Sequence, residues 1–507
     1  KLLSFQVFIV LFGVGSLSKE INLKKSLGLN AVLSGLQSLL NLIFPLITFP
    51  YASRVLSVSG MGKYNFAGSI NGYFLLIAAL GINTFAIREG AKFRDDREKI
   101  SAFASKVFTI NLISTLIAYI LLGLTLLVIS NLKIYIIAIL MYSIQIFCTT
   151  IGVNWIYTIF EEYAYITIRN IIFKIISVIL LFAFVRHSGD YLNYVAITVF
   201  ASAGSYILNY LYAKRFVDLK LNFNFNWKEY LQPIFIIFIS TVAVQIYVNS
   251  DTTMLGFMQT NYVVGIYGVS VKIYTIIANL LWSVLLVTVP RLAMLMGKKH
   301  YREYFGLLRR VINTLILIVF PIMAGLFIFS NEAVVIVGDQ KYLRATSSLR
   351  ILCLALIFKL LGTVFNDCVL IPAKRENKLL ISYVAAAVVN ILLNFILIPI
   401  LAENGAALTT LLAEFVSMAM NFYFSRDIVG DIIKEKAFIQ NIVSVIGAVT
   451  LMCVVCLIGK NFIGNMILRL IITIPIAAVI YCIALFALKN STFISLFNEV
   501  KSRLKLR

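Results

Sequence analysis

Three lysines lie near the middle of long apolar segments, where an ammonium group is costly. They are Lys174, Lys272 and Lys359, and a lysine at the centre of a membrane helix costs about 2.5–3.5 kcal/mol on insertion scales. Such a residue needs an acidic partner or a water-filled cavity, where it can bind a polyanion. Lys272 shares a helix face with Thr275 and Asn279. We therefore predict a substrate-binding site along that face.

The same kind of segment holds three acidic side chains. Glu414 is central, whereas Asp251 and Asp367 lie nearer to the ends of their segments. Each acid could pair with a deep lysine, as Glu414 could with Lys359, or could bind Na⁺ or a proton. The sequence leaves both interpretations open, so the three acids are candidates for ion coupling.

Other basic residues lie closer to the ends of apolar segments. Long side chains at such positions can extend to the membrane boundary, which we expect of Lys106, Arg169, Arg350 and Arg469. By position alone, three further arginines are predicted to bind a substrate head group near the mouths of a cavity: Arg54, Arg88 and Arg291.

The chain that positions these residues has the composition of a polytopic membrane protein. Of its 507 residues, 61% are apolar and 13% are charged, whereas a soluble domain has about 25% charged residues. A bilayer core of about 30 Å needs about 20 apolar residues per helix. We predict an all-α membrane protein with fourteen transmembrane helices, at 29–52, 64–87, 103–129, 133–157, 163–185, 191–213, 233–256, 262–289, 305–330, 345–372, 378–401, 405–425, 440–459 and 463–488.

Residues that could support catalysis or bind a metal are few. The two histidines, His187 and His300, fall in predicted loops, and the six cysteines fall in apolar segments. Cys453 and Cys456 form a CxxC pair inside an apolar run, but a redox or zinc site needs polar surroundings and partners. We interpret the pair as small buried residues, and we predict no metal site, no cofactor and no enzymatic activity.

Lysine and arginine are distributed unequally between alternate loops. With the N-terminus inside, the inner loops and tail hold 29 of them and the outer loops hold 7. Because positive residues favour the cytoplasmic side, both termini are predicted to be cytoplasmic. The net charge of +22 is attributed to this topology and to anionic lipid. Nucleic-acid binding is the weaker interpretation, since no basic soluble domain is present.

A short motif occurs twice in the chain. "GKYNFAGSI" begins at Gly62 and "GIYGVSVKI" at Gly265, and an arginine, Arg88 or Arg291, follows 26 residues after each glycine. We interpret the halves as parallel six-helix lobes around a central cavity, followed by two C-terminal helices. The predicted divisions are an unassigned segment at 1–26, an N-lobe at 27–213, a cytoplasmic inter-lobe linker at 214–232, a C-lobe at 233–425, helices 13 and 14 at 426–488 and a basic cytoplasmic tail at 489–507.

Three stretches of the chain resemble one known family. They are "FPYASRVLSVSGMGKYNFAGSINGYFLLIAALGINTFAIREGAK" (49–92), "NWIYTIFEEYAYITIRNIIFKIISVI" (154–179) and "VNSDTTMLGFMQTNYVVGIYGVSVKIY" (248–274). They resemble bacterial oligosaccharide-lipid flippases of the polysaccharide transporter branch of the multidrug/oligosaccharidyl-lipid/polysaccharide exporter superfamily. The resemblance covers about residues 20–490.

The resemblance implies a flippase for surface polysaccharide such as O-antigen or capsule. Such a protein moves undecaprenyl-pyrophosphate-linked oligosaccharide repeat units from the inner to the outer leaflet by alternating access through a cationic lumen. The implied location is the bacterial cytoplasmic membrane. Expected partners are the lipid-linked glycan, membrane lipids, and a polymerase with other glycan-assembly proteins, with Na⁺ or H⁺ as candidate coupling ions.

Two other functions compete with this interpretation. A multidrug exporter of the same superfamily would favour a negatively charged site for cationic drugs, whereas the deep charges here are biased towards positive. A polytopic enzyme that processes glycans would need acidic or nucleophilic residues in a recognisable arrangement. The sequence has no DxD pair and no large outer loop.

Overall fold

The computed structural model describes residues 35, 43–286 and 288–505. Within these ranges the chain forms helices joined by short turns, without any β-strand. The predicted all-α class is therefore confirmed. The unassigned segment at 1–26 and most of the first predicted helix, 29–52, lie outside the described residues.

The first half begins with a helical stretch at residues 43–55. The next helix begins after Ser57, whose hydroxyl oxygen accepts a hydrogen bond from the N–H of Gly60 and so caps the helix. The elements that follow are α4 (Val58–Ala79), α5 (Ile82–Gly90), η1 (Ala91–Phe93), α6 (Arg97–Val128), η2 (Ser130–Tyr135), α7 (Ile136–Ile151), α8 (Asn154–Ile159), α9 (Tyr163–Phe184), α10 (Tyr191–Ala203) and α11 (Tyr206–Ala213).

The second half continues with a similar succession of long helices. Its elements are η3 (Trp227–Leu231), α12 (Gln232–Met258), α13 (Asn261–Leu286), α14 (Val289–Gly297), α15 (Tyr301–Ile328), α16 (Ser330–Gly338), η4 (Gln340–Tyr342), α17 (Ala345–Thr363), η5 (Val364–Leu370), α18 (Glu376–Leu401) and α19 (Glu403–Lys434). The last three helices are α20 (Lys436–Phe462), α21 (Met466–Ala487) and α22 (Ser491–Lys505).

Among the described residues, twelve helices are long and apolar enough to cross a membrane. This number supports a polytopic membrane protein. Two of the fourteen predicted segments are not among the twelve. The first lies mostly outside the described residues, and the other is α12, although it is 27 residues long. The count of fourteen stays a prediction.

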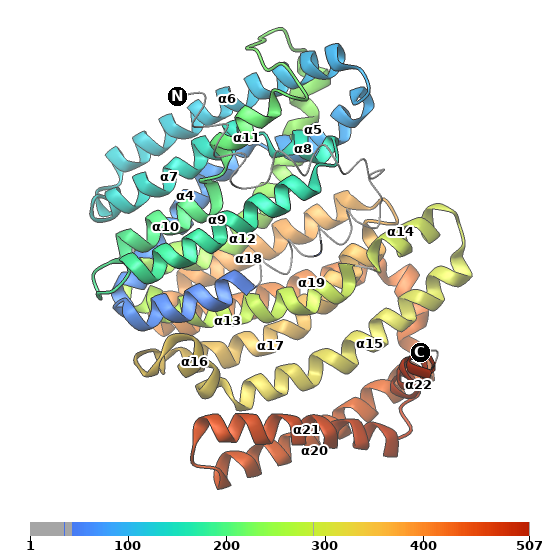
Figure 1. Ribbon diagram of the computed structural model, residues 1–507. Helices are drawn as coiled ribbons and strands as arrows, with labels where there is room; N and C mark the ends of the chain where they lie inside the picture. The colour runs from blue at the N-terminus through green and yellow to red at the C-terminus, as the bar shows by residue number, and fades with distance from the viewer. Residues whose placement is uncertain (1–34, 36–42, 287, 506–507) are drawn as a thin grey trace.

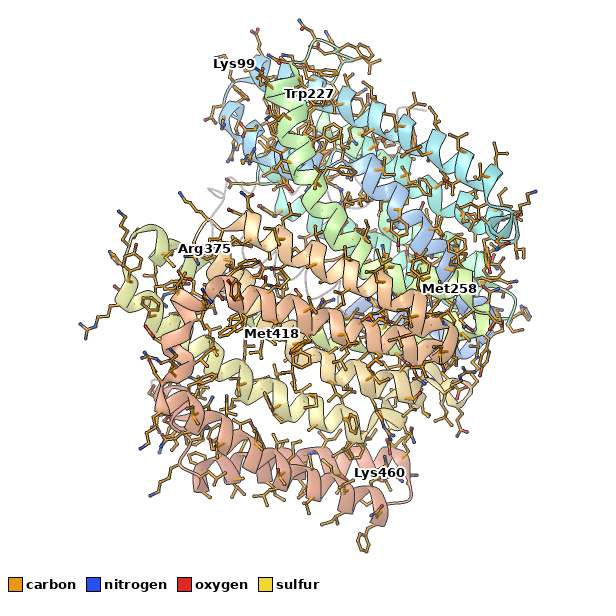
Figure 2. All side chains as sticks on the ribbon, turned by 180° about the vertical axis from the view of Figure 1, so that it is seen from behind. Lys99, Trp227, Met258, Arg375, Met418 and Lys460 are labelled. Carbon is orange, nitrogen blue, oxygen red and sulfur yellow. The ribbon has the colours of Figure 1, made fainter. Side chains whose placement is uncertain are left out.

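The long helices lie roughly side by side in layers (Figure 1). α4, α6, α7 and α10 pack together in the first half, and α12, α13, α17, α18 and α19 pack together in the second. α20 and α21 form a hairpin that packs on α15 at the edge of the molecule. In Figure 2, Lys99 and Trp227 lie at one end of the helices, and Met258 and Lys460 lie towards the other. The domain boundaries stay a prediction.

Two glycines of the repeated motif bring α4 and α13 into backbone contact. A Cβ atom added to Gly62 would lie 1.8 Å from the carbonyl oxygen of Asn261, and one added to Gly265 would lie 2.1 Å from that of Val58. Each glycine packs on the residue four positions before the other glycine, so the contact is reciprocal. Only glycine permits such a close backbone approach. The contact closes α4 against α13 at the end where both helices begin.

Candidate functional site

Asp251 on α12 lies at the centre of a buried polar cluster. Its side chain is 5% exposed. Asn390 and Asn394 of α18 donate hydrogen bonds to its Oδ1 at 2.9 and 2.7 Å. The hydroxyl of Tyr267 on α13 donates to Oδ2 at 2.8 Å, and that of Thr410 on α19 donates to the same oxygen. Four neutral donors from three neighbouring helices therefore surround one carboxylate, which allows it to stay buried.

A second layer of hydroxyl groups fixes the two asparagines. Ser250 donates to Oδ1 of Asn390 at 2.5 Å, and Thr409 donates to Oδ1 of Asn394 at 2.6 Å. The amide and hydroxyl groups around Asp251 therefore point their hydrogen atoms at its carboxylate, and the two amide oxygens accept hydrogen bonds from Ser250 and Thr409. The cluster solvates one buried negative charge, and the role of Asp251 in ion coupling stays a prediction.

Glu414 and Lys359 form an ion pair inside the second half. Nζ of Lys359 lies 3.0 Å from Oε1 of Glu414, and the hydroxyl of Tyr274 donates to the same oxygen at 3.2 Å. Glu414 is buried, whereas the Lys359 side chain retains 33% exposure. The sequence left both pairing with Lys359 and ion binding open for Glu414, and the structure contains the pairing. The role of Lys359 towards a substrate stays a prediction.

Lys272 on α13 has no carboxylate partner in the part of the chain that the structure describes. Its side chain is half-buried, and Nζ lies 5.5 Å from the ring centroid of Phe49. The Thr275 hydroxyl donates to the carbonyl oxygens of Val271 and Lys272, whereas Asn279 is exposed. On the predicted helix face, the ammonium group of Lys272 and the amide of Asn279 are therefore available to a ligand. The hydroxyl of Thr275 is not, because it already donates within its own helix.

The other two deep charges have different surroundings. Nζ of Lys174 lies 5.6 Å from the ring centroid of Phe44, which places this lysine beside the helix of residues 43–55. Asp367 lies in the π-helical segment η5 and accepts a hydrogen bond from Nε1 of Trp282 at 3.2 Å. Asp251, with four donors, therefore accepts more hydrogen bonds than either of the other two candidate acids.

Comparison with known proteins identifies the family. A family model described as "Polysaccharide biosynthesis protein" matches residues 27–296, which is more than half of the 507 residues. The chain belongs to this family. The relationship predicted from the three sequence stretches is confirmed.

Two curated relatives carry the name "Putative O-antigen transporter". The one from Escherichia coli (strain K12) is 25% identical over 54% of this chain, and the match spans 66% of that protein, just under two thirds of its length. The one from Shigella dysenteriae is 25% identical over 70% of this chain and 89% of its own length. These names agree with the prediction of a family member that is a membrane transporter and not an enzyme.

Solved structures of the same fold include flippases and exporters. "Lipid II flippase MurJ, inward closed conformation" matches with a TM-score of 0.69 and 17% identity, covering 94% of this chain and 100% of that one. An inward-facing multidrug resistance MATE family transporter of the MOP superfamily matches with a TM-score of 0.58 and 16% identity, covering 79% of this chain and 96% of that one. At identities of 17% and 16%, these matches show that the chain shares its fold with the two proteins.

Of the three arginines predicted near the mouths of a cavity, two contact other groups in this family member and one is exposed. Nη2 of Arg54 donates to the carbonyl oxygen of Ile336 at 2.8 Å, so it joins the first described helix to α16. Nε of Arg88 pairs with the neighbouring Glu89 at 3.0 Å. Arg291 is exposed. Their role towards a substrate stays a prediction.

Two arginines expected to extend to the membrane boundary differ in their surroundings. Arg169 is 7% exposed, donates to the side-chain oxygens of Asn170 and Asn209, and lies over the ring of Tyr165. For Arg169 the boundary prediction is wrong, because polar partners on other helices lie within reach. Arg469 does extend to the end of its helix, where Nε donates to the carbonyl oxygen of Ile463 at 2.8 Å and the guanidinium pairs with Glu332 at 2.6 Å.

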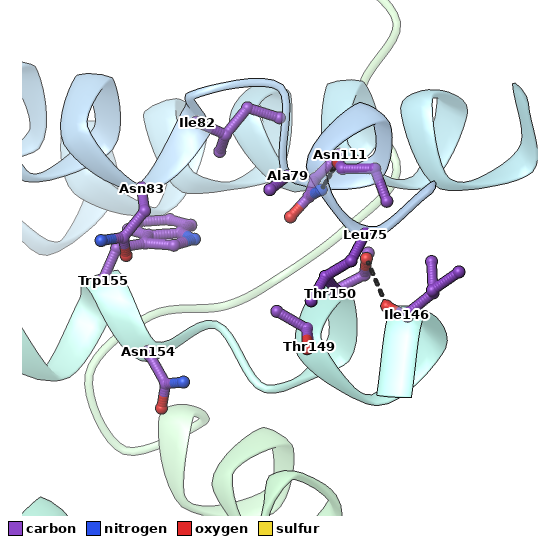
Figure 3. A pocket seen from close by; sticks show the side chains of 11 residues that line it. Leu75, Ala79, Ile82, Asn83, Asn111, Ile146, Thr149, Thr150, Asn154 and Trp155 are labelled. Carbon is purple, nitrogen blue, oxygen red and sulfur yellow. Dashed lines mark hydrogen bonds between the residues drawn. The ribbon is translucent and has the colours of Figure 1, made fainter. Parts of the chain in front are cut away.

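The first half contains a cavity with several polar side chains in a mostly apolar lining, which was not predicted from the sequence. It has a volume of about 230 Å³ and lies between α4, α5, α6, α7 and α8 (Figure 3). Asn83, Asn111, Thr149 and Asn154 contribute polar groups to its lining, and Trp155 borders it. These residues come from four of the five helices, so no single helix face could reveal the cavity.

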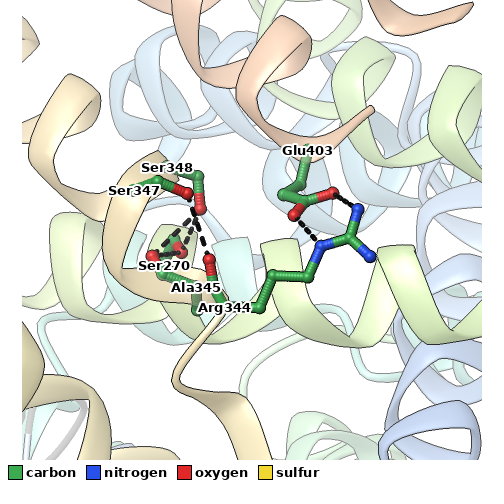
Figure 4. A network of polar contacts seen from close by, with 6 residues as sticks. All are labelled: Ser270, Arg344, Ala345, Ser347, Ser348 and Glu403. Carbon is green, nitrogen blue, oxygen red and sulfur yellow. Dashed lines mark hydrogen bonds and ion pairs between the residues drawn. The ribbon is translucent and has the colours of Figure 1, made fainter. Parts of the chain in front are cut away.

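A polar network at Ser270, the tenth residue of α13, fixes this helix to its neighbours (Figure 4). The hydroxyl of Ser270 donates to the carbonyl oxygen of Ala345 at 2.9 Å and lies 2.7 Å from the hydroxyl of Ser348. Beside Ser270, Nη2 of Arg344 donates to Oε2 of Glu403 at 2.9 Å, and Nε of Arg344 donates to Oε1. These hydrogen bonds to a carboxylate raise the pKa of Arg344 above its ordinary value. The Ser270 contacts thereby join α13 to α17. The Arg344–Glu403 pair joins the turn before α17 to the start of α19.

Proposed function

We propose that this family member is a flippase for undecaprenyl-pyrophosphate-linked oligosaccharide repeat units. It would move them from the inner to the outer leaflet of a bacterial cytoplasmic membrane by alternating access, for the assembly of surface polysaccharide. Both termini would be cytoplasmic, and a polymerase with other glycan-assembly proteins would act on the delivered units. Family membership and the names of the two relatives support this proposal.

The observation that carries the proposal is the position of Lys272. It is the twelfth residue of the 26-residue helix α13, so it lies about 17 Å from the start of a helix about 39 Å long. An ammonium group at this depth without a carboxylate partner among the described residues needs an anionic ligand or water. A pyrophosphate linkage supplies such an anion, and the exposed Asn279 supplies a further donor on the same face.

The contact between α4 and α13 supports alternating access. Gly62 and Gly265 seal the two halves together at the end where these helices begin, which is the predicted outer end. A substrate can leave on that side only if the seal opens. The proposal therefore requires a second conformation in which the two glycines separate.

Asp251 is the acid that we propose for ion coupling. Its donors come from α13, α18 and α19, so a bound Na⁺ or proton would alter contacts among all of these helices. Occupation of the cluster could therefore favour one conformation over another, because a ligand shifts an equilibrium by its differential affinity.

The test uses the purified protein in liposomes with a fluorescent undecaprenyl-pyrophosphate-linked disaccharide. Transfer between leaflets is measured as the fraction of probe that a membrane-impermeant reagent can reach. We expect transfer with the native chain and its loss with Lys272→Gln. If a cationic drug is transported and the lipid-linked probe is not, the multidrug exporter is the better interpretation, and the flippase proposal is overturned.

A further inference from the structure

The connection between the two halves is held against α6 by a row of hydroxyl groups. The hydroxyl oxygens of Ser101, Ser105 and Thr109 accept hydrogen bonds from three backbone N–H groups, those of Asp218, Lys220 and Asn222, at 3.0, 3.1 and 2.8 Å. Residues 217–226 adopt no regular secondary structure. We call this segment the strap.

The regular spacing of these bonds has a geometric basis. Four residues of an α-helix rise about 6.0 Å, and two residues of extended chain span about 6.6 Å. Every fourth residue of α6 therefore meets every second residue of the strap. Ser105 and Thr109 are 5% and 1% exposed, so the strap covers these hydroxyls completely.

The covered face of α6 continues as bare apolar surface. Beyond Thr109 the same face presents Ile113, Leu116 and Ile120, which are 37%, 62% and 53% exposed. Exposed apolar residues on a membrane-spanning helix face the acyl chains of the bilayer. The strap therefore covers the continuation of the side of α6 that faces lipid.

The length of α6 places the strap at the membrane boundary. Its 32 residues extend about 48 Å, whereas the hydrocarbon core is about 30 Å thick. The far end stays apolar and open, since Leu127 and Val128 are 79% and 80% exposed. The excess of about 18 Å, or about 12 residues, therefore falls at the other end of α6, beside the strap.

The outer side of the strap has the composition of an interfacial segment. Leu221 and Phe223 are 62% and 68% exposed, and Trp227, the first residue of η3, is 57% exposed. Lys220 and Lys228 are also exposed. Aromatic and basic side chains together favour the head-group region. Backbone groups of the strap that do not face α6 also need water or head groups, which the hydrocarbon core lacks.

We propose that the strap is a lipid-binding surface. Leu221, Phe223 and Trp227 enter the boundary between head groups and acyl chains in the leaflet where α6 begins, and Lys220 and Lys228 bind the phosphate oxygens of anionic lipids. The connection between the halves is thus embedded in the membrane surface and does not hang free in water. This inference does not depend on which substrate the protein transports.

Tryptophan fluorescence tests the proposal directly. In a W155F/W282F variant, Trp227 is the single tryptophan, because the chain has three, and it is excited at a wavelength that tyrosine does not absorb. The full chain is reconstituted in vesicles of phosphatidylcholine and phosphatidylglycerol whose acyl chains carry bromine close to the head groups or close to the bilayer centre. We expect strong quenching by the shallow bromines, weaker quenching by the deep ones and little quenching by acrylamide in the water.

Phe223 is tested by introducing tryptophan at its position. The F223W substitution is made in a W155F/W227F/W282F background, and K99W in the same background is the control, because Lys99 is exposed and lies at the same end as Trp227 (Figure 2). Shallow bromines should quench F223W, and acrylamide should quench K99W. Efficient acrylamide quenching of F223W and of Trp227 would show a strap in water. Protection of both from both quenchers would show a protein cover. Either result overturns the proposal.

The lysines are tested by changing the lipid charge. With F223W, replacing phosphatidylglycerol by phosphatidylcholine should reduce quenching by shallow bromines, and K220Q/K228Q should remove that dependence on lipid charge. The removal of both charges should leave the apolar contacts. An equal dependence on phosphatidylglycerol with and without the two lysines would show that they do not bind anionic lipid.

Discussion

α4 in the first half and α13 in the second begin with the same Gly-x-Tyr motif, but their tyrosines lie in different surroundings. The ring of Tyr64 stacks on Tyr194 with centroids 4.4 Å apart, and its hydroxyl lies 3.3 Å from that of Thr198. The hydroxyl of Tyr267 instead donates to the carboxylate of Asp251. The same motif thus packs against neutral groups in one half and against an acid in the other.

Other positions at equal distances from the two glycines differ in the same way. Asp251 precedes Gly265 by as many residues as Thr48 precedes Gly62, and the Thr48 hydroxyl donates to a carbonyl oxygen of its own helix. Lys272 follows its glycine by as many residues as Ser69, which is buried and donates to the carbonyl oxygen of Phe66. At these positions, only the second half carries charge.

The two halves share the close helix packing at the motif glycines but not the charged side chains. Close helix packing needs only a small residue at the contact, and both halves have one. A buried charge needs several donors placed around it, and Asp251 has them because asparagines of α18 and a threonine of α19 converge there. We therefore expect substitutions at the glycines to act alike in both halves, and substitutions at the charged positions to act in the second half alone.

The largest effect is expected at Lys272. Lys272→Glu should abolish transfer of the lipid-linked probe, Lys272→Gln should lose it, and Lys272→Arg should retain part of it, because charge is the main requirement and Arg differs in shape. Ser69→Ala, the counterpart in the first half, should leave transfer within about twofold, because it removes two hydrogen bonds between neutral groups, to Phe66 and from Thr253, and no charge. Normal transfer by Lys272→Glu would assign the lysine a structural role.

A smaller effect on transport is expected at Asp251. Asp251→Asn keeps the size of the side chain and removes its charge, so an imposed Na⁺ or H⁺ gradient should no longer accelerate transfer, while downhill exchange continues. Thr48→Val should respond to the gradient as the native chain does. Transfer by Asp251→Asn that is still accelerated by the gradient would remove this residue from the coupling mechanism.

The glycine substitutions should reduce stability similarly in both halves. Gly62→Ala and Gly265→Ala each place a Cβ inside the contact distance of a backbone oxygen, which should lower the free energy of unfolding by about 1–3 kcal/mol. Gly123→Ala on α6 is the control, because a Cβ there meets nothing within 4 Å. Thermal unfolding in detergent measures all three. A large effect at one motif glycine and none at the other would contradict the reciprocal contact.

The smallest effect is expected for the Lys359–Glu414 pair. Lys359→Met or Glu414→Gln should each lower the free energy of unfolding by about 1–2 kcal/mol, below the 3–5 kcal/mol of a fully buried pair, because Lys359 stays partly exposed. The double variant should recover most of this loss, since neither partner is left alone. Additive losses in the double variant would show that the two side chains act independently.

The sequence predicted the helical class well, because long apolar segments permit little else in a membrane. It also identified Asp251 and Lys272 as deep charges from their positions alone. It could not decide whether Lys359 binds Glu414, because the two are 55 residues apart and their contact depends on how α17 packs against α19. The partners of Asp251 on α18 and α19 were missed for the same reason.

Arg169 also shows that the sequence does not reveal contacts between residues far apart in the chain. Its position near a segment end predicts a side chain that reaches for the membrane boundary, yet the amide of Asn209, forty residues later in the chain, holds it inside. Periodicity gives the face on which a residue lies, but not the residue that faces it. Asparagine and tyrosine occur too often in apolar segments for the sequence to show which of them will surround an arginine.

The reciprocal glycine contact restricts how α4 and α13 can move relative to each other. A slide of one helical turn along the helix axes would bring Phe66 or Val269 to the places now occupied by Gly62 and Gly265, and neither side chain fits against a backbone oxygen. Because the two contacts are related by an exchange of the helices, a slide in either direction meets an obstacle at one of them. The reciprocal contact therefore resists shear, and a relative movement of α4 and α13 would first have to separate the two helices.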